Sequence, residues 1–467
     1  MQVGMLASVL LWLPIVAAAA QPVRWEQIAR TGIRNIDEPA LARSGDGSLH
    51  IVWRQQTATG NSELRHLMLD PDGGIKGEAQ VAVGGWKSLS NPALLVAAGG
   101  SLDLLFGGVL GSQDVKDPYN NGSLYRATAR ADGLRWELQS GAQSTDRYAY
   151  LGPIGASFGP DGQPWLSWPA SSKLVVQHGL GSVPAEQVHD YGCCPYQGQV
   201  ASDGANGQVI VGWYSNAGRQ HGILLRPVAP ALGEAAAAPG SYVESGGQMQ
   251  SRSQDQQLGL TGRTGGAPGV YVAYCSGYPV CTAVVLWRYR EPQPVVVAKV
   301  KQGRTATVAK GPEGRLWVMW SDESGPAALR TNKAATRLGP SLRLGPAPVL
   351  KLKGEGSNGP LDLFANSGSA ILHTRVFPPL QASVVPSTVE ADKGGKVKFA
   401  VTDVGDPVAG ATLTVGNQSL TTGPDGSAPY SVPAGAKPGT LTVKFQMSGY
   451  QPTEITLEIR PPKPLQR

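Results

Sequence analysis

The chain has 467 residues, of which 41% are apolar and 16% are charged, with 61 glycines and 37 prolines. This composition excludes a disordered chain and predicts turn-rich β structure in two or three units. The net charge of +6 is spread along the chain without a run of basic and aromatic residues, so a nucleic-acid partner is not expected.

Residues 1–20 have the pattern of a secretory signal peptide. An apolar stretch from Leu6 to Ala17 leads to three alanines that precede Gln21 and provide a small-residue cleavage site. This stretch is short for a membrane span, and no later segment is apolar for about 18 residues. We therefore expect a secreted or extracytoplasmic protein, periplasmic or extracellular, without a transmembrane segment after cleavage and in a compartment that permits disulfides.

A β-hairpin is predicted around the sequence GPEGRLWVMWS, Gly311–Ser321. Pro312 and Gly314 favour a tight turn, and apolar, β-branched and aromatic residues flank it on both sides. A single hairpin is marginally stable in water, so the chain must supply partners for it.

Six other segments repeat this hairpin, at spacings of about 45 to 62 residues. In five of the seven copies an aromatic residue follows the turn glycine by six positions, and in another Tyr274 follows Pro268 by the same step. The weak last copy, residues 360–374, has Thr374 there. The pairs of glycine and aromatic are Gly47 and Trp53, Gly100 and Phe106, Gly162 and Trp168, Gly207 and Trp213, and Gly314 and Trp320.

This repeat predicts an all-β fold, a six- or seven-bladed β-propeller with seven blades favoured, over residues 21–377. Each repeated aromatic is expected to fill the gap between neighbouring blades as core. A lone strand at Val23–Ile28 is expected to complete the last blade, which lacks outer strands of its own. Two long inserts, Gly107–Tyr150 and Tyr214–Gln257, are candidates for rim loops.

A second unit is predicted over residues 378–460. It follows the stiff sequence Val376–Pro379, and its short alternating strands suit a small β-sandwich. The proline-rich tail, residues 461–467, is expected to be disordered.

The first copy, IDEPALARSGDGSLHIVWR, resembles the opening blade of the sialidase-like propellers with BNR repeats. In that family an R-I-P-x-L segment leads into a D-G turn, and its arginine grips the substrate carboxylate. Aligned on Pro39–Leu41, Asp37 occupies the position of that arginine, and an aspartate repels a carboxylate. The resemblance therefore implies the fold without sialidase activity.

The second unit resembles bacterial Ig-like domains of the invasin and carboxypeptidase-regulatory-like kinds. The resemblance is carried by GDPVAGATLTV, Gly405–Val415, and TTGPDGSAPYSV, Thr421–Val432. It implies a spacer or adhesion module.

The propeller geometry gathers residues that precede the first strand of a blade, or follow its aromatic, at one face around the channel. The ligand-binding candidates among them are Arg54, Asn91, Tyr196, Tyr214, Arg304, Glu323, Asn358 and Arg375, and the catalytic candidates are Asp37, Glu38, Asp255 and Asp322. Such groups on a concave face suit a polar ligand such as a sugar, although a solvated rim of paired charges has the same composition.

All four cysteines fall on that face. We expect the pairs Cys193–Cys194 and Cys275–Cys281, with cross-bridges between the two loops as the alternative. Loops containing two adjacent cysteines occur in sialidase-like secreted proteins, which supports the vicinal pair by resemblance. The six histidines are scattered and no C-x-x-C spacing occurs, so no zinc and no other cofactor is expected.

The leading hypothesis is noncatalytic recognition of a glycan or an extracellular protein on this face. The alternative is a glycoside hydrolase or polysaccharide lyase, which needs two carboxyl groups roughly 5 to 9.5 Å apart. In a third interpretation the propeller is a scaffold and the sandwich is adhesive.

Overall fold

The computed structural model describes residues 24–30, 38–112, 122–130, 132, 135–141, 153–170, 173–181, 186–189, 195–203, 206–217, 220–241, 258–263, 268–277, 281–347 and 349–462. Their contacts divide the chain into two units, Val23–Pro378 and Pro379–Arg467. Within these ranges the regular structure is β-strand, apart from a 3-10 turn at Pro312–Gly314. The expected all-β class is confirmed.

The predicted hairpin is the inner half of a four-stranded antiparallel sheet. Gly311 N donates to Arg315 O at 2.7 Å, and Gly314 closes the turn with φ +81°. The strands beyond the turn alternate their side chains, so that one face packs on the preceding sheet and the other on the following one. In sheet order the strands are β22 (Thr305–Lys310), β23 (Leu316–Asp322), β24 (Gly325–Arg330) and β25 (Leu342–Arg343).

Three other sheets of the first unit repeat this four-stranded order along the chain. The first consists of β10 (Gly155–Phe158), β11 (Pro164–Ala170), β12 (Lys173–His178) and β13 (Glu186–His189). The second consists of β14 (Pro195–Ser202), β15 (Val209–Ala217), β16 (Gln220–Ala229) and β17 (Ala236–Ala237). The third consists of β18 (Gly259–Arg263), β19 (Gly269–Ser276), β20 (Cys281–Arg288) and β21 (Val295–Gly303).

The first eight strands after β1 form one larger sheet, because the long strand β5 pairs with β4 over its length and with β7 at its end. Its members are β2 (Ala40–Arg43), β3 (Leu49–Gln56), β4 (Ser62–Leu69), β5 (Ile75–Leu89), β6 (Ala93–Val96), β7 (Leu102–Leu110), β8 (Ser123–Ala129) and β9 (Trp136–Leu138).

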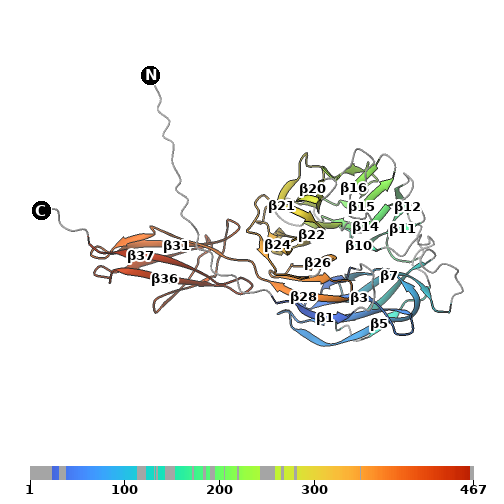
Figure 1. The fold of residues 1–467 in the computed structure, drawn as a ribbon, viewed down its shortest axis with the longest axis horizontal. Coiled ribbons are helices and arrows are strands. Elements are labelled where there is room, and N and C mark those ends of the chain that lie inside the picture. Colours follow the sequence, from blue (N-terminus) through green and yellow to red (C-terminus); the bar gives the residue numbers. More distant parts are fainter. Residues whose placement is uncertain are drawn as a thin grey trace, which may run out of the picture. The chain divides into compact units, whose positions relative to one another are not determined.

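The last sheet joins the two ends of this unit. Strand β1 (Glu26–Arg30) pairs with β28 (Ala370–Val376), which continues to β27 (Leu361–Asn366) and β26 (Lys351–Glu355). The expectation that an N-terminal strand completes the last repeat is confirmed. In Figure 1 the sheets follow one another in chain order from blue to orange, and the orange β28 returns beside the blue β1.

The first strands of successive repeats contact one another in a closed cycle. In the order β2, β6, β10, β14, β18, β22 and β26, each strand contacts the next. The last of them, β26, contacts the first, β2. In six of the seven repeats the second strand carries the aromatic at the fixed offset from the turn, and this aromatic is almost fully buried in a cluster shared with the preceding repeat. These residues are Trp53, Phe106, Trp168, Trp213, Tyr274 and Trp320. Their expected role as core is confirmed.

The predicted position of the last hairpin is wrong by one strand. The inner hairpin is β26–β27, with its turn at residues 356–360, whereas Thr374 lies in the third strand, β28. Six positions after the turn residue Gly359 stands Ala365, which is buried but lacks the bulk that marks the other copies. The glycine at Gly368 made the second turn look like the first.

The second unit consists of two sheets that share one core. Phe399 of β31 (Gly395–Asp403) packs against Phe445 of β36 (Gly439–Gln446), with ring centroids 6.1 Å apart. The β31 sheet also contains β29 (Gln381–Val385), β32 (Asp406–Pro407) and β35 (Ser427–Val432), and the β36 sheet contains β30 (Thr388–Glu390), β33 (Thr412–Val415), β34 (Gln418–Thr421) and β37 (Thr453–Arg460).

Among the described residues, no helix is long and apolar enough to cross a membrane.

Candidate functional site

The strands of the repeats in the first unit end at two faces. We call the end at which the first strand of each repeat begins the start face, and the end that carries the turn between first and second strands the turn face. Interactions between neighbouring repeats join like ends: Ile154 N, before β10, donates to Asn91 O, before β6, and Leu258 N, before β18, donates to Gln197 Oε1 at the beginning of β14. The start face therefore brings together residues that are far apart in the sequence.

A charged group lies on the start face where the last sheet meets the first. Glu38, just before β2, lies 3.8 Å from Lys351 Nζ and 3.6 Å from Lys353 Nζ. Lys351 and Lys353 share one side of β26 because the residue between them, Leu352, packs toward the β23 sheet. The Glu38 and Lys351 side chains are only 11% and 3% exposed, whereas that of Lys353 is 30% exposed. Two ammonium groups around one carboxylate leave a net positive charge.

Two more predicted residues extend this group along the start face. Arg54, at the end of β3, donates through Nη1 to Leu89 O at 2.7 Å, and so reaches the segment that precedes β6. Asn91 in that segment is buried, and its side-chain Oδ1 accepts no hydrogen bond from the described residues. An unsatisfied buried acceptor is uncommon and suits a ligand donor. We refer to Glu38, Arg54, Asn91, Lys351 and Lys353 as the start-face cluster.

The predicted tyrosines lie in the core of their sheet. Tyr196 of β14 and Tyr214 of β15 are cross-strand partners, and Tyr214 is buried while Tyr196 is half-buried. Burial, together with the neighbouring Tyr196, raises the pKa of Tyr214. A raised pKa opposes phenolate formation, so Tyr214 is poorly suited to act as a nucleophile.

Asp322 has a structural ion pair. It ends β23, is buried, and its two oxygens lie 2.9 and 3.0 Å from Arg343 Nη1 while Ser324 N donates to it at 2.8 Å. These contacts occupy the carboxylate of a predicted catalytic candidate. Arg304 and Glu323 are exposed on the same start face, where they remain available to a ligand.

Asn358 and Arg375 lie on the turn face, contrary to their predicted position. Asn358 is in the turn between β26 and β27, and Arg375 near the end of β28 pairs in register with Asp362 at the beginning of β27. Their misplacement follows directly from the one-strand error in the last hairpin. The candidates Asp37, Asp255, Cys193 and Cys194 lie outside the described residues.

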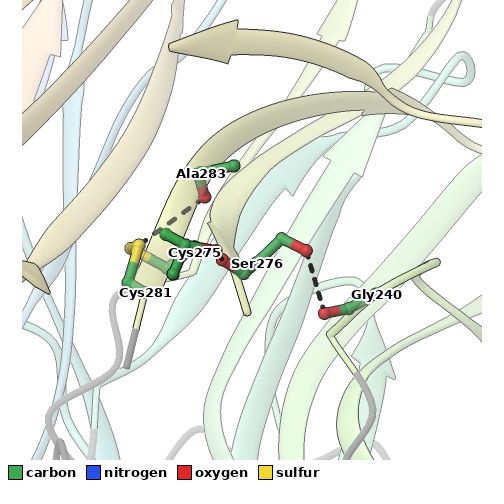
Figure 2. The surroundings of a disulfide bond; sticks show 6 residues. Gly240, Cys275, Ser276, Cys281 and Ala283 are labelled. Atoms are coloured by element: carbon green, nitrogen blue, oxygen red, sulfur yellow. Dashed lines mark hydrogen bonds between the residues drawn. A yellow bond between two sulfur atoms is a disulfide. The ribbon is translucent and has the colours of Figure 1, made fainter. Parts of the chain in front are cut away.

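The disulfide Cys275–Cys281 is confirmed, which excludes cross-bridges that would use either cysteine. It joins the end of β19 to the beginning of β20 (Figure 2). Ser276 next to it donates to Gly240 O at 3.1 Å. A side chain at Gly303, just before Arg304, would collide with Cys281 Sγ, so the bridge packs directly against the end of β21.

Replacing Cys275 and Cys281 by serine together is expected to lower the free energy of unfolding by about 2 kcal/mol, because the bridge limits the entropy of a short loop in the unfolded chain. Urea titration with tryptophan fluorescence measures the loss, and wild type in reducing agent provides the comparison. Peptide mapping of the unreduced protein checks the pairing. An unreduced wild type no more stable than the double variant would contradict the role given to the bridge.

A buried charge cluster on the turn face was missed by sequence reasoning. Arg43 at the end of β2 contacts Glu355 through Nε, and its Nη2 lies 2.7 Å from Asp362. His373 Nε2 and Arg375 Nη1 lie 3.2 and 3.9 Å from the same carboxylate. In the sequence these residues look like the polar positions of any alternating strand. Their proximity becomes visible only where the last sheet meets the first. The cluster joins these two sheets and has no opening toward solvent at Asp362, which is 1% exposed.

No set of three or more histidine, cysteine or acidic side chains among the described residues could hold a metal ion.

No family model matches the sequence, and no curated protein matches it. Solved structures resemble it at low identity. The extracellular domain of a hybrid two-component system from B. thetaiotaomicron has a TM-score of 0.42 and 12% identity over 95% of this chain, which spans 60% of that one. A chain of the mitotic checkpoint complex has a TM-score of 0.42 and 12% identity, and the match covers 79% of this chain and 99% of that one. A glucose dehydrogenase has a TM-score of 0.37 and 14% identity, and the match covers 66% of this chain and 99% of that one.

Proposed function

We propose that the first unit is a seven-bladed propeller of the sialidase-like kind and that the second is an Ig-like sandwich. The closed cycle of seven first strands supports the blade number, since each begins a repeat and the last contacts the first. The long strand β5 serves two neighbouring blades, which accounts for the one larger sheet. The shared core of the two sheets supports the sandwich.

The protein acts outside the cytoplasm in this proposal. The signal-like sequence of residues 1–20 and the disulfide Cys275–Cys281 support export to an oxidising compartment.

The function we propose is noncatalytic recognition of an acidic extracellular glycan by the start-face cluster. The observation that carries it is the pair of lysines around Glu38, which gives excess positive charge to the start face where the last repeat meets the first. Lys353 is accessible enough to reach an anion, and Asn91 Oδ1, which lacks a hydrogen-bond partner among the residues that the structure describes, can accept a hydrogen bond from a ligand hydroxyl. A charged group and an amide acceptor together suit a uronate-containing sugar better than a neutral one.

The carboxylates in the described part of the start face favour recognition without cleavage. Hydrolysis of a glycosidic bond needs one carboxyl group to deliver a proton and a second across the bond. On the start face Glu38 is engaged by two lysines and Asp322 by Arg343 and Ser324 N. We therefore assign Glu38 to the binding site and Asp322 to a structural ion pair.

Lys353→Glu is expected to weaken binding of acidic glycans about tenfold or more, because it reverses the accessible charge of the cluster. A glycan array with uronate-rich and neutral polysaccharides identifies the ligand, and titration with the best binder measures the loss. Lys299→Glu, an equal charge reversal on the exposed side of β21, is the matched control and should bind as wild type does.

Three results would count against this function. Unchanged binding by Lys353→Glu removes the site, and preference for neutral glycans or for a protein partner removes the ligand class. Release of reducing or unsaturated sugar from a bound glycan indicates the glycosidase or lyase alternative.

A further inference from the structure

A second, unassigned pocket lies on the turn face between the β14 and β18 sheets. Its volume is about 280 Å³, which is near the small end of ligand pockets, and it is therefore of a size for one small molecule. Its polar lining comes from two turns, those before β15 and after β20, and consists of Asn206, Gln208, Arg288, Tyr289, Arg290 and Glu291.

One wall of the pocket is held rigidly. Arg288 donates through Nη2 to Pro268 O at 2.6 Å and lies 3.2 Å from Glu291 Oε1 through Nη1. Trp287 Nε1 donates to Glu291 O at 2.7 Å, which fixes the far end of the same turn. A side chain at Gly269 would meet the Arg288 guanidinium of the neighbouring strand in the same sheet, so the glycine leaves room for this arginine. Arg288 is therefore part of the frame.

Arg290 has the opposite character. Its backbone is left-handed, with φ +70°, a conformation that is unfavourable for a long side chain. The guanidinium is exposed and lies 5.3 Å from the centre of the Tyr289 ring, and no carboxylate among the described residues pairs with it. A strained residue that presents an unpaired cation to a pocket suits a bound anion.

The remaining polar groups suit hydroxyls. Asn206 is held by Asp203, since its Nδ2 donates to Asp203 Oδ2 at 2.9 Å, whereas the Gln208 side chain makes no hydrogen bond within the described part of the chain. Glu291 retains a second carboxylate oxygen beyond the one near Arg288. An amide and a carboxylate beside one cation are the groups that a polyhydroxylated acid would use.

We propose that this pocket binds a small polyhydroxylated carboxylate, that is, a sugar acid, with Arg290 on the carboxylate and Gln208 and Glu291 on hydroxyls. The same chemistry is found in a free sugar acid and in a uronate at the end of a glycan chain. This site is separate from the start-face cluster, so each can fail without the other.

The test is calorimetric titration of the full chain with glucuronate, glucose and acetate. Glucuronate is expected to bind at least tenfold more tightly than glucose, which lacks the carboxylate, or acetate, which lacks the hydroxyls. An oligosaccharide ending in glucuronate distinguishes the sources: tighter binding than the monosaccharide indicates a chain end, and equal binding indicates the free acid.

Arg290→Asn is the decisive variant, because asparagine accepts the left-handed backbone and removes the charge. We expect it to lose at least tenfold in glucuronate affinity while its melting temperature is equal to or above that of wild type. Arg337→Asn, the same change at an exposed turn residue of the β22 sheet, is the matched control, and Lys353→Glu should leave this site unchanged. Gln208→Leu is expected to weaken glucuronate more than acetate.

The proposal is overturned if glucuronate does not bind, if glucose or acetate binds equally well, or if Arg290→Asn binds glucuronate as wild type does.

Discussion

Asp362→Ala is expected to lower the free energy of unfolding of the first unit by about 3–5 kcal/mol, the range for breaking a buried ion pair by removing one partner. Asp362 accepts from Arg43 Nη2 at 2.7 Å and contacts His373 Nε2 at 3.2 Å, and its side chain is 1% exposed. Removal of the carboxylate leaves the Arg43 guanidinium buried with Glu355 as its remaining acid. Because Arg43 belongs to the first sheet and Asp362 to the last, the loss falls on the closure of the unit.

Urea titration followed by tryptophan fluorescence measures this loss. Asp72→Asn, which removes an exposed charge from a nearby turn, should have little effect, and Asp362→Asn, which keeps the size and one acceptor, should fall between the two. A loss in Asp362→Ala no larger than in Asp72→Asn would show that the cluster does not hold the closing sheets together.

The same carboxylate gives the protein a defined response to acid. Burial opposes ionisation, but the hydrogen bond from His373 and the charge of Arg375 prevail and hold the pKa of Asp362 below its ordinary value of 3.8. A lowered pKa in the folded state contributes stability that is present above the unfolded value and is lost as the pH falls through the folded one.

A separate acid response comes from the buried pair His50 and His66, whose facing ring nitrogens lie 3.0 Å apart. Burial, and then the charge of His50, lowers the pKa of His66 from 6.5 to about 4, so the unfolded state takes up this proton first and stability declines as the pH falls from about 6.5 to about 4. Wild type and Asp362→Ala should therefore lose stability in parallel across that range and converge below the ordinary carboxyl pKa. Parallel curves down to the most acid pH would contradict the assignment to Asp362.

Trp320→Ala is expected to lower the free energy of unfolding by about 3–5 kcal/mol, the usual range for removal of a large buried aromatic. Trp320 is 1% exposed and belongs to a cluster that includes Ala273 and Leu286 from the preceding sheet and Val308 from its own. The cavity cannot collapse easily, because strands on both sides are fixed by their hydrogen-bonded ladders.

The matched control is Trp165→Ala. Trp165 is half-buried and stacks at 4.3 Å on His178, whose side chain is 44% exposed, so less apolar surface is lost there. Thermal and urea unfolding of both variants provide the comparison. Equal losses of unfolding free energy in the two variants would contradict the role of Trp320, because they would show that removing the buried ring between two sheets costs no more than removing the half-buried ring of Trp165.

The sequence was sufficient for the repeating part of the fold. The aromatics at a fixed offset from their turns correctly located the second strands of six repeats, because a turn needs glycine and a gap between neighbouring repeats needs bulk, and both demands act locally. The cysteine pair Cys275–Cys281 was also predictable, since a loop between adjacent strands determines its own geometry. In the last repeat Ala365 stands in place of the aromatic, so the pattern located the hairpin one strand too late and predicted Asn358 and Arg375 on the wrong face.

The amino-acid sequence by itself determined the strand alternation, the hairpin turns and the residues that fill the spaces between sheets, because each depends on neighbours within about ten positions. Only the tertiary structure decided that Glu38 lies between Lys351 and Lys353, that Asp322 is occupied by Arg343, and that two turns enclose the pocket at Arg290. Electrostatic partners are chosen by distance in space, and closing the chain on itself brings together charges that are more than three hundred residues apart.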